Sequence, residues 1–310
     1  AQQQQTTEAE LKHFIKASRI KLFNEREKRV HPFKDDKILT DWNGLMIAAL
    51  AKGALILDEP TYLVAARRAA EFLWTSLRDA QGNLHKRYRN GEAGLSGHLD
   101  DYTFFTWGLL ELYEATLEPR YLIQATELQE QTFTEFWDEI NGGFFLGKAS
   151  TEDLPVRSKT GYDGALPSGN SVAAMNLQRL GRLTGQNQWL TMAETIGRVF
   201  SAEIDRNPTA FTALLTATLF ALDDPREVVI VGAPQQKDTR TFIRTLQATY
   251  TPHKVLLLID PTEPEVLSTV APWIKPYSIL NDQPTAYICK NYTCQQPTND
   301  VKQAMKYLQQ

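Results

Sequence analysis

The sequence predicts a mainly α-helical protein, an α/α toroid built from repeated helix hairpins, with a small α/β appendage at the C-terminal end. Three observations predict it: an apolar stripe repeated in three segments, more uniformly apolar helices before each stripe, and β-rich runs confined to the last part of the chain. We expect the toroid hairpins to occupy residues 1–223 and the appendage residues 224–310.

The repeated stripe is assigned to the outer helices of the hairpins. Each copy starts at an aromatic residue, Tyr62, Tyr121 or Trp189, and continues at steps of 4, 7, 11 and 15 residues. The positions reached are Ala66, Ala69, Leu73 and Leu77; Ala125, Leu128, Thr132 and Phe136; and Ala193, Ile196, Phe200 and Ile204. This spacing places one apolar stripe on a helix, and Thr132 is the single polar exception.

The helices before the stripes, 45–57, 102–113 and 172–183, are apolar on most faces. Such helices are buried between layers, which places them on the inside of a ring. Pro or Gly punctuates each short link between an inner and an outer helix. We expect a further inner helix at 211–222 and an outer helix at about 8–28. The alternation favours a toroid, and a solenoid of helix pairs is the competing architecture.

The appendage is predicted from a βαβ pattern. Residues 227–232 and 255–259 are short β-rich runs, and a helical stretch at 239–249 lies between them. A strand, a helix and a second strand in this order favour a parallel pair. The turn after the first run, Val231-Gly232-Ala233-Pro234, lacks the further glycines of a dinucleotide loop, so no cofactor is expected.

Composition excludes several classes of partner. The 310 residues include 37 acidic and 33 basic side chains that are mixed along the chain, and the net charge is −4. No basic stripe with interleaved aromatics is present, so no nucleic-acid partner is expected. No apolar run approaches the length of a membrane span, and no membrane partner is expected. No His, Asp and Glu cluster has metal-ligand spacing, so no metal is expected.

The two cysteines, Cys289 and Cys294, form neither a CxxC redox pair nor a zinc knuckle. The simplest interpretation is a reduced, cytoplasmic protein. Because Ala1 stands where an initiator Met would be, we expect the sequence to be a fragment or a processed form.

Polar residues gather at the starts of the inner helices. The three segments are Asp41-Trp42-Asn43-Gly44, His98-Leu99-Asp100-Asp101-Tyr102 and Pro167-Ser168-Gly169-Asn170-Ser171. If the inner helices run parallel around a ring, these starts meet at one mouth, where helix N-termini favour anionic groups. The alternative is that Asp41, Asp100 and Ser168 only cap their helices, because Asp and Ser are standard N-cap residues.

The pair Asp100 and Asp101 is the candidate acid/base centre, with His98 beside it. Adjacent carboxylates repel, which raises the pKa of one of them and keeps it protonated as a general acid. Aromatic rings next to paired acids are typical of sugar sites, so Trp42 and Tyr102 are candidate stacking platforms. The remaining candidate substrate-binding residues at the helix starts are Asp41, Asn43, Ser168 and Asn170.

A second set of candidates lies in loops expected at the same mouth. Arg87 and Tyr88 belong to the run 85–89, and Arg157 and Asp163 precede the third inner helix. Basic residues there would bind an anionic substrate or neutralise the carboxylates of the mouth. Both interpretations remain open at the level of sequence.

The same motifs carry a family resemblance. They are Asp35-Asp36-Lys37-Ile38-Leu39-Thr40-Asp41-Trp42-Asn43-Gly44-Leu45-Met46, then Leu99-Asp100-Asp101-Tyr102, Pro167-Ser168-Gly169-Asn170-Ser171, and the closing Tyr287-Ile288-Cys289 to Cys294-Gln295-Gln296-Pro297. With these segments the chain resembles the helical part of the YyaL-type, thioredoxin domain-containing proteins, whose animal members are the spermatogenesis-associated thioredoxin-like proteins. The resemblance implies part of a six-hairpin, glycosidase-like toroid, related in shape to N-acylglucosamine 2-epimerases and cellobiose epimerases. It also implies a thioredoxin-like domain or partner.

Three functional hypotheses follow. The first is a protein that binds or processes a carbohydrate at the toroid mouth, with Asp100 and Asp101 as the acid/base pair. The second is a non-catalytic scaffold or partner-binding module, in which both carboxylates are consumed by capping and ion pairs. The third is a sugar 2-epimerase, which needs two opposed bases and has only His98 and His85 as candidates.

Overall fold

The computed structural model describes residues 6–148 and 156–309, which fall into two compact units, Ala1–Lys37 and Ile38–Gln310. The first unit contains α1 (Glu8–Arg26), which begins with a capping box: Thr7 accepts from the backbone N–H of Glu10, and the Glu10 side chain accepts from that of Thr7. None of its residues is buried. The expected helix is therefore present, but in a unit separate from the packed hairpins.

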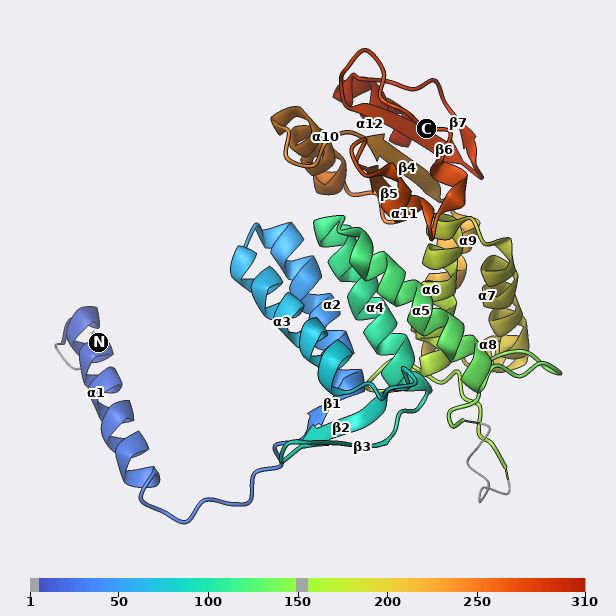
Figure 1. The fold of residues 1–310 in the computed structure, drawn as a ribbon. Coiled ribbons are helices and arrows are strands. Elements are labelled where there is room, and N and C mark those ends of the chain that lie inside the picture. Colours follow the sequence, from blue (N-terminus) through green and yellow to red (C-terminus); the bar gives the residue numbers. More distant parts are fainter. Residues whose placement is uncertain (1–5, 149–155, 310) are drawn as a thin grey trace. The chain divides into compact units, whose positions relative to one another are not determined.

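The second unit holds the helix pairs of the toroid (Figure 1). They are α2 (Thr40–Leu57) with α3 (Pro60–Ser76), α4 (Leu99–Thr116) with α5 (Pro119–Phe136), and α6 (Gly169–Thr184) with α7 (Asn187–Val199) and α8 (Ser201–Arg206); a short 3-10 helix, Pro208–Ala210, then leads into α9 (Thr212–Leu222). The inner helices α2, α4, α6 and α9 pack as successive neighbours. This arrangement confirms the mainly α class and the toroid architecture.

The repeated stripe lies mostly on the buried face of the outer helices, although Tyr62 at the start of the first copy is exposed. On α5 all of its positions are buried, from Tyr121 to Phe136. Thr132, the polar exception, is fully buried, and its hydroxyl donates to the backbone carbonyl of Leu128. A polar group inside the packed layer is thereby satisfied within its own helix. The third stripe ends at Phe200, where the helix breaks, so Ile204 lies on α8 instead.

Two glycines, Gly44 and Gly108, allow a close backbone approach between the inner helices α2 and α4. A Cβ atom added to Gly44 would lie 2.5 Å from the backbone carbon of Phe104, and one added to Gly108 would lie 2.8 Å from the carbonyl oxygen of Gly44. Only glycine leaves room for backbone to pack on backbone at this distance. The contact fixes how the start of α2 lies against the start of α4.

A small antiparallel sheet was not predicted. Its strands are β1 (Ile38–Leu39), β2 (His85–Arg89) and β3 (Glu92–Ser96), in the order β1-β2-β3. The run 85–89, which the sequence placed in a loop, is a strand because Asn90 and Gly91 both adopt positive φ and close a two-residue hairpin turn. The Asn-Gly pair is a hairpin signal that the sequence does contain.

The appendage confirms the expected βαβ unit. Its elements are β4 (Arg226–Val231), α10 (Lys237–Ala248), β5 (Lys254–Ile259), α11 (Pro264–Ser268), a 3-10 helix (Pro272–Ile274), β6 (Thr285–Lys290), β7 (Thr293–Cys294) and α12 (Val301–Leu308). Strands β4 and β5 pair in parallel, β6 runs antiparallel to β4, and the sheet order is β5-β4-β6-β7. The appendage belongs to the same compact unit as the hairpins, so the division between residues 223 and 224 stays a prediction.

The expectation of reduced cysteines is wrong for this structure. Cys289 of β6 and Cys294 of β7 are register partners across an antiparallel pair, and their sulfurs form a disulfide. The two side chains come together because a tight turn folds the strands onto each other, which residue spacing alone did not reveal. In the described ranges, no helix combines the length and apolarity needed to cross a membrane.

Candidate functional site

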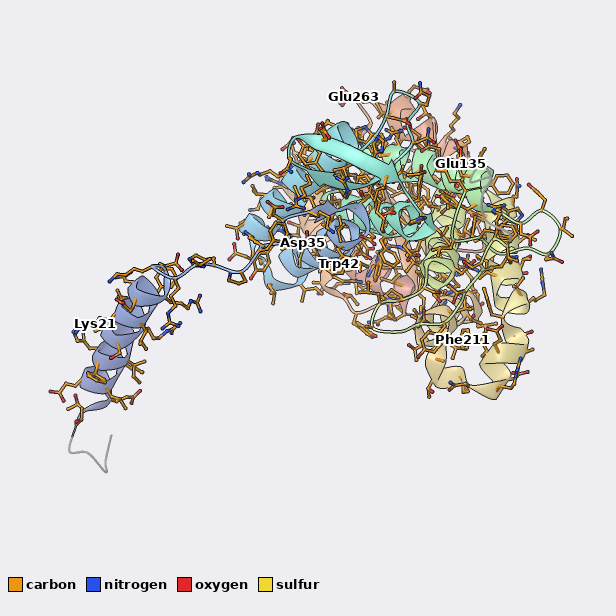
Figure 2. The ribbon with its side chains drawn as sticks, turned by 90° about the horizontal axis from the view of Figure 1, so that it is seen from below. Lys21, Asp35, Trp42, Glu135, Phe211 and Glu263 are labelled. Carbon is orange, nitrogen blue, oxygen red and sulfur yellow. A yellow bond between two sulfur atoms is a disulfide. The ribbon has the colours of Figure 1, made fainter. Side chains whose placement is uncertain are left out.

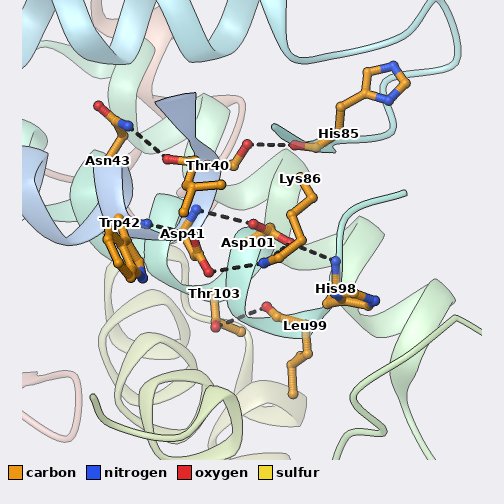
Figure 3. Close-up of polar contacts among 11 residues, drawn as sticks. Thr40, Asp41, Trp42, Asn43, His85, Lys86, His98, Leu99, Asp101 and Thr103 are labelled. Atoms are coloured by element: carbon orange, nitrogen blue, oxygen red, sulfur yellow. Dashed lines mark hydrogen bonds and ion pairs between the residues drawn. The ribbon is translucent and has the colours of Figure 1, made fainter. Parts of the chain in front are cut away.

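Three segments distant in sequence meet at the start of α2. The Lys86 ammonium group on β2 lies 3.0 Å from Oδ2 of Asp41 and 3.5 Å from Oδ2 of Asp101 (Figure 3). Asp101 also accepts hydrogen bonds from the backbone N–H groups of Asp41, at 3.2 Å, and His98, at 2.8 Å. The Asp101 carboxylate therefore ties β2, α2 and α4 together.

Asp101 is fully buried, and its burial raises the pKa of the carboxyl to about 7. The Lys86 charge and the backbone donors of His98 and Asp41 oppose this rise, whereas the Asp41 carboxylate adds to it. The pKa of Lys86 is raised in turn: burial lowers it, but Asp101 and Asp41 together outweigh that effect. A carboxyl that is half protonated near neutral pH thus lies at the centre of the cluster.

Asp100, the neighbour of Asp101 in the sequence, is only partly buried. It accepts a hydrogen bond from the backbone N–H of Gly169, the first residue of α6. Its pKa is raised by burial, lowered by Lys86 and raised again by Asp41. Asp100 therefore joins the start of α4 to the start of α6. A partly accessible carboxyl with a raised pKa is suited to proton transfer.

Trp42 is the exposed aromatic of this mouth, with 60% of its surface accessible. Figure 2 shows its position at the end of the unit where the inner helices begin. Its backbone N–H donates to Oδ1 of Asp41 at 2.8 Å. Asn43 donates from Nδ2 to the carbonyl of Leu39 at 2.8 Å and keeps Oδ1 available.

Tyr102, predicted as a second stacking platform, is fully buried. Its ring packs edge-on against Phe136, and its hydroxyl accepts from the backbone N–H of Leu84. Stacking on a sugar requires an open ring face, so this prediction is wrong. Asp101 is equally inaccessible, and its carboxylate is engaged by Lys86 and by the backbone N–H groups of Asp41 and His98.

Four other candidates are engaged in structural contacts. Ser168 caps α6 by accepting from the N–H of Ser171, and Asn170 bonds to both backbone groups of Phe144. Asp163 accepts from the backbone N–H groups of Ser168 and Ala213, and so joins the loop before α6 to the start of α9. The guanidinium of Arg157 donates to backbone carbonyls, including that of Gly147 at 2.8 Å, and lies over the Phe145 ring. Capping and loop bracing therefore account for these four side chains.

Lys86 belongs to the basic run 85–89 that was expected near the carboxylates, but only Arg87 and Tyr88 of that run were named as site residues. Tyr88 packs edge-on against Phe72 of α3, and Lys86 is the residue that reaches the carboxylates. Side chains alternate between the two faces of a strand, so recognising β2 would have separated Lys86 from Arg87. In Figure 3 the ring of His85 points away from the carboxylates.

His98 lies at the surface beside this cluster. Its pKa is lowered, first by partial burial of the imidazole and then by the charge of Lys86, and Asp41 opposes both. A neutral imidazole near pH 7 can accept a proton. Across residues 6–148 and 156–309, no group of three or more His, Cys, Asp or Glu side chains could hold a metal ion.

The Asp101 carboxyl makes stability depend on pH. Its folded pKa of about 7 lies above the unfolded value, so the folded chain holds a proton that the unfolded chain releases. Its contribution to stability is therefore present at acid pH and is lost as pH rises towards 7. We expect the melting temperature of the wild type, measured relative to that of Asp101→Asn, to decrease as pH rises from about 4 to about 7. These limits are the unfolded and folded pKa values of the carboxyl. Thermal unfolding across that range measures it, and a pH-independent difference would contradict the raised pKa.

The packed helix pairs and the parallel inner-helix starts define an α/α toroid protein. Over 298 residues the chain is 36% identical to human spermatogenesis-associated protein 20, and over 300 residues it is 34% identical to the mouse protein. These matches cover 93% and 94% of this chain but 38% of each relative, so the chain spans less than half the length of the relatives it matches. No protein-family model matches the chain.

The fold is similar to that of a solved toroid enzyme. A GH76 α-mannanase from Bacteroides thetaiotaomicron superposes with a TM-score of 0.51 at 15% sequence identity. The match covers 70% of this chain and 59% of the mannanase. At this level of identity the similarity concerns the fold alone.

Proposed function

We propose that the protein binds a carbohydrate at the mouth formed by the starts of α2, α4 and α6, with Asp100 acting as acid or base. The observation that carries the proposal is the position of Asp100. It is a partly accessible carboxyl with a raised pKa, bonded to the start of α6 and electrostatically coupled to Lys86 and Asp41. The exposed Trp42 supplies an apolar face for a pyranose ring beside it.

The fold comparison supports the ligand class. The solved protein with a similar fold is named an α-mannanase. The paired acids and the aromatic at the inner-helix starts of this chain independently favour a sugar ligand. In this proposal Asn43 and Asp41 bind hydroxyls, and Lys86 with Asp101 holds Asp41 in place. We further propose membership of the YyaL-type family, a thioredoxin-like domain or partner, and a cytoplasmic location.

Binding is tested by thermal shift with a panel of mono- and oligosaccharides. We expect at least one sugar to raise the melting temperature of the wild type, and Trp42→Ala to abolish the shift without loss of fold because the ring is exposed. Tyr250→Ala is the matched control, since Tyr250 is 90% exposed and belongs to the appendage. A panel without any shift, or a shift that survives Trp42→Ala, would count against the proposal.

Chemistry at Asp100 is tested separately. In Asp100→Asn the amide oxygen can still accept from Gly169, so we expect the fold and the sugar-induced shift to persist. Turnover of any sugar that the wild type converts should fall by roughly 10²- to 10⁴-fold, the usual contribution of a general acid or base. Unchanged turnover would remove Asp100 from the mechanism.

A non-catalytic binding module is the second candidate. It is favoured by the complete engagement of Asp101 in capping and ion pairing, and by the structural contacts of Arg157 and Asp163. For this function the sugar panel should give no shift. No observed contact favours the epimerase hypothesis. In Figure 3 the rings of His85 and His98 do not face a common point.

A further inference from the structure

The turn of the β6–β7 hairpin in the appendage is hydrogen-bonded to the C-terminal end of α6. Tyr292, in the turn between β6 and β7, donates from its hydroxyl to the carbonyl of Gly181 at 3.1 Å. Its backbone N–H donates to the Glu227 carboxylate at 3.2 Å, and the other oxygen of that carboxylate pairs with Arg182 of α6. One residue of the turn therefore contacts both the toroid and the buried ion pair beneath it.

The turn has an unfavourable backbone conformation that needs support from surrounding contacts. Asn291 has a φ of 49° and Tyr292 a φ of 60°. Asparagine tolerates this left-handed region, but a bulky aromatic residue rarely adopts it. The disulfide between Cys289 and Cys294 lies one residue pair away from the turn, beyond Lys290 and Thr293. The cross-link and the contacts of the Tyr292 side chain together keep the tip in this conformation.

Aromatic side chains connect the disulfide to the same end of α6. The Tyr277 hydroxyl lies 3.1 Å from Sγ of Cys294, and the Tyr277 ring packs edge-on against Trp273. Trp273 packs edge-on against Tyr292 and donates from its indole nitrogen to the carbonyl of Leu183 at 2.9 Å. Breaking the disulfide would therefore disturb side chains that contact Tyr292 and the end of α6.

The two sulfurs differ in access. Cys289 is 1% exposed, whereas Cys294 is partly accessible. Cys289 also lines a cavity of about 140 Å³ together with Arg226 and Lys290. An attacking thiolate reaches the more accessible Cys294, so Cys289 is the leaving group.

We propose that the Cys289–Cys294 disulfide is a redox site for a dithiol, and that its reduction releases the hairpin tip from the end of α6. One thiolate of the dithiol attacks Sγ of Cys294, the bond between Cys289 and Cys294 breaks, and Cys289 leaves as a thiolate and takes up a proton. The second thiol of the reductant then attacks the mixed disulfide, which frees Cys294. Two electrons and two protons pass to the protein, and the dithiol becomes a cyclic disulfide.

The test uses the full chain with dithiothreitol under native conditions. Alkylation and intact-mass measurement give the fraction reduced, and hydrogen exchange is followed in peptides covering 181–186 and 286–296. We expect native reduction, with exchange in both peptides faster by roughly fivefold or more, as loss of the Tyr292 contacts implies. Exchange in 61–76 of α3 serves as the internal control and should not change.

A variant separates the tip from the cross-link. Tyr292→Phe keeps the disulfide but removes the hydroxyl bond to Gly181, so its oxidised form should already exchange at 181–186 about as fast as the reduced wild type. A disulfide that resists dithiothreitol in the native state would overturn the proposal. So would full reduction with unchanged exchange at 181–186.

Discussion

Glu227→Ala is expected to lower the free energy of unfolding by about 3–5 kcal/mol. Glu227 is fully buried on β4, and its carboxylate lies 2.7 Å from the Arg182 guanidinium of α6, which is itself 8% exposed at the side chain. Removing the carboxylate leaves a buried positive charge without its partner, and that cost exceeds the value of the pair itself. The loss also removes the acceptor for the backbone N–H of Tyr292.

Urea or guanidinium unfolding measures this change, and two further variants show its origin. The double variant Arg182→Met, Glu227→Met removes both charges and should recover most of the lost stability. Glu194→Ala breaks a pair with Arg198 whose side chains are 61% and 66% exposed, and it should cost less than about 1 kcal/mol. Equal losses for Glu227→Ala and Glu194→Ala would show that burial of the Arg182 pair is unimportant.

Gly44→Ala is expected to cost about 3 kcal/mol or more. The added Cβ would lie 2.5 to 2.6 Å from three backbone atoms of Phe104 and Phe105, and backbone within a packed helix cannot rotate away. Helices α2 and α4 must then separate, which also moves Asp41 and Trp42 away from Asp100. The variant should therefore lose the sugar-induced thermal shift together with stability.

Gly53→Ala on the same helix is the matched control. A Cβ at Gly53 meets only the Tyr62 ring, at 3.5 Å, which is an ordinary contact. Alanine is the better helix former, so this change should leave stability unchanged or raise it by up to about 1 kcal/mol. If both glycine variants behaved alike in thermal and denaturant unfolding, the close approach of α2 and α4 would not be what selects Gly44.

Part of the candidate site could be predicted from the sequence and part could not. Asp100 and Trp42 were predicted because a paired acid and an aromatic begin inner helices, and helix starts at one mouth follow from the repeat. Tyr102 was misassigned because the sequence does not tell which side of a helix start faces solvent. Lys86 was not distinguished from its neighbours in the basic run 85–89, because the Asn-Gly turn that marks this run as a strand was not used as a signal.

The sequence by itself determined the helix hairpins and the βαβ unit, because periodic apolar positions encode which face of an element is buried. It also placed polar residues at the inner-helix starts, where α2, α4 and α6 begin. Only the tertiary structure decided which of those residues stays accessible. Burial and hydrogen bonding depend on neighbours far away in the chain: Lys86 and His98 engage Asp101, whereas Gly169 leaves Asp100 partly open. The joining of Cys289 to Cys294 was decided in the same way, by the register of two strands.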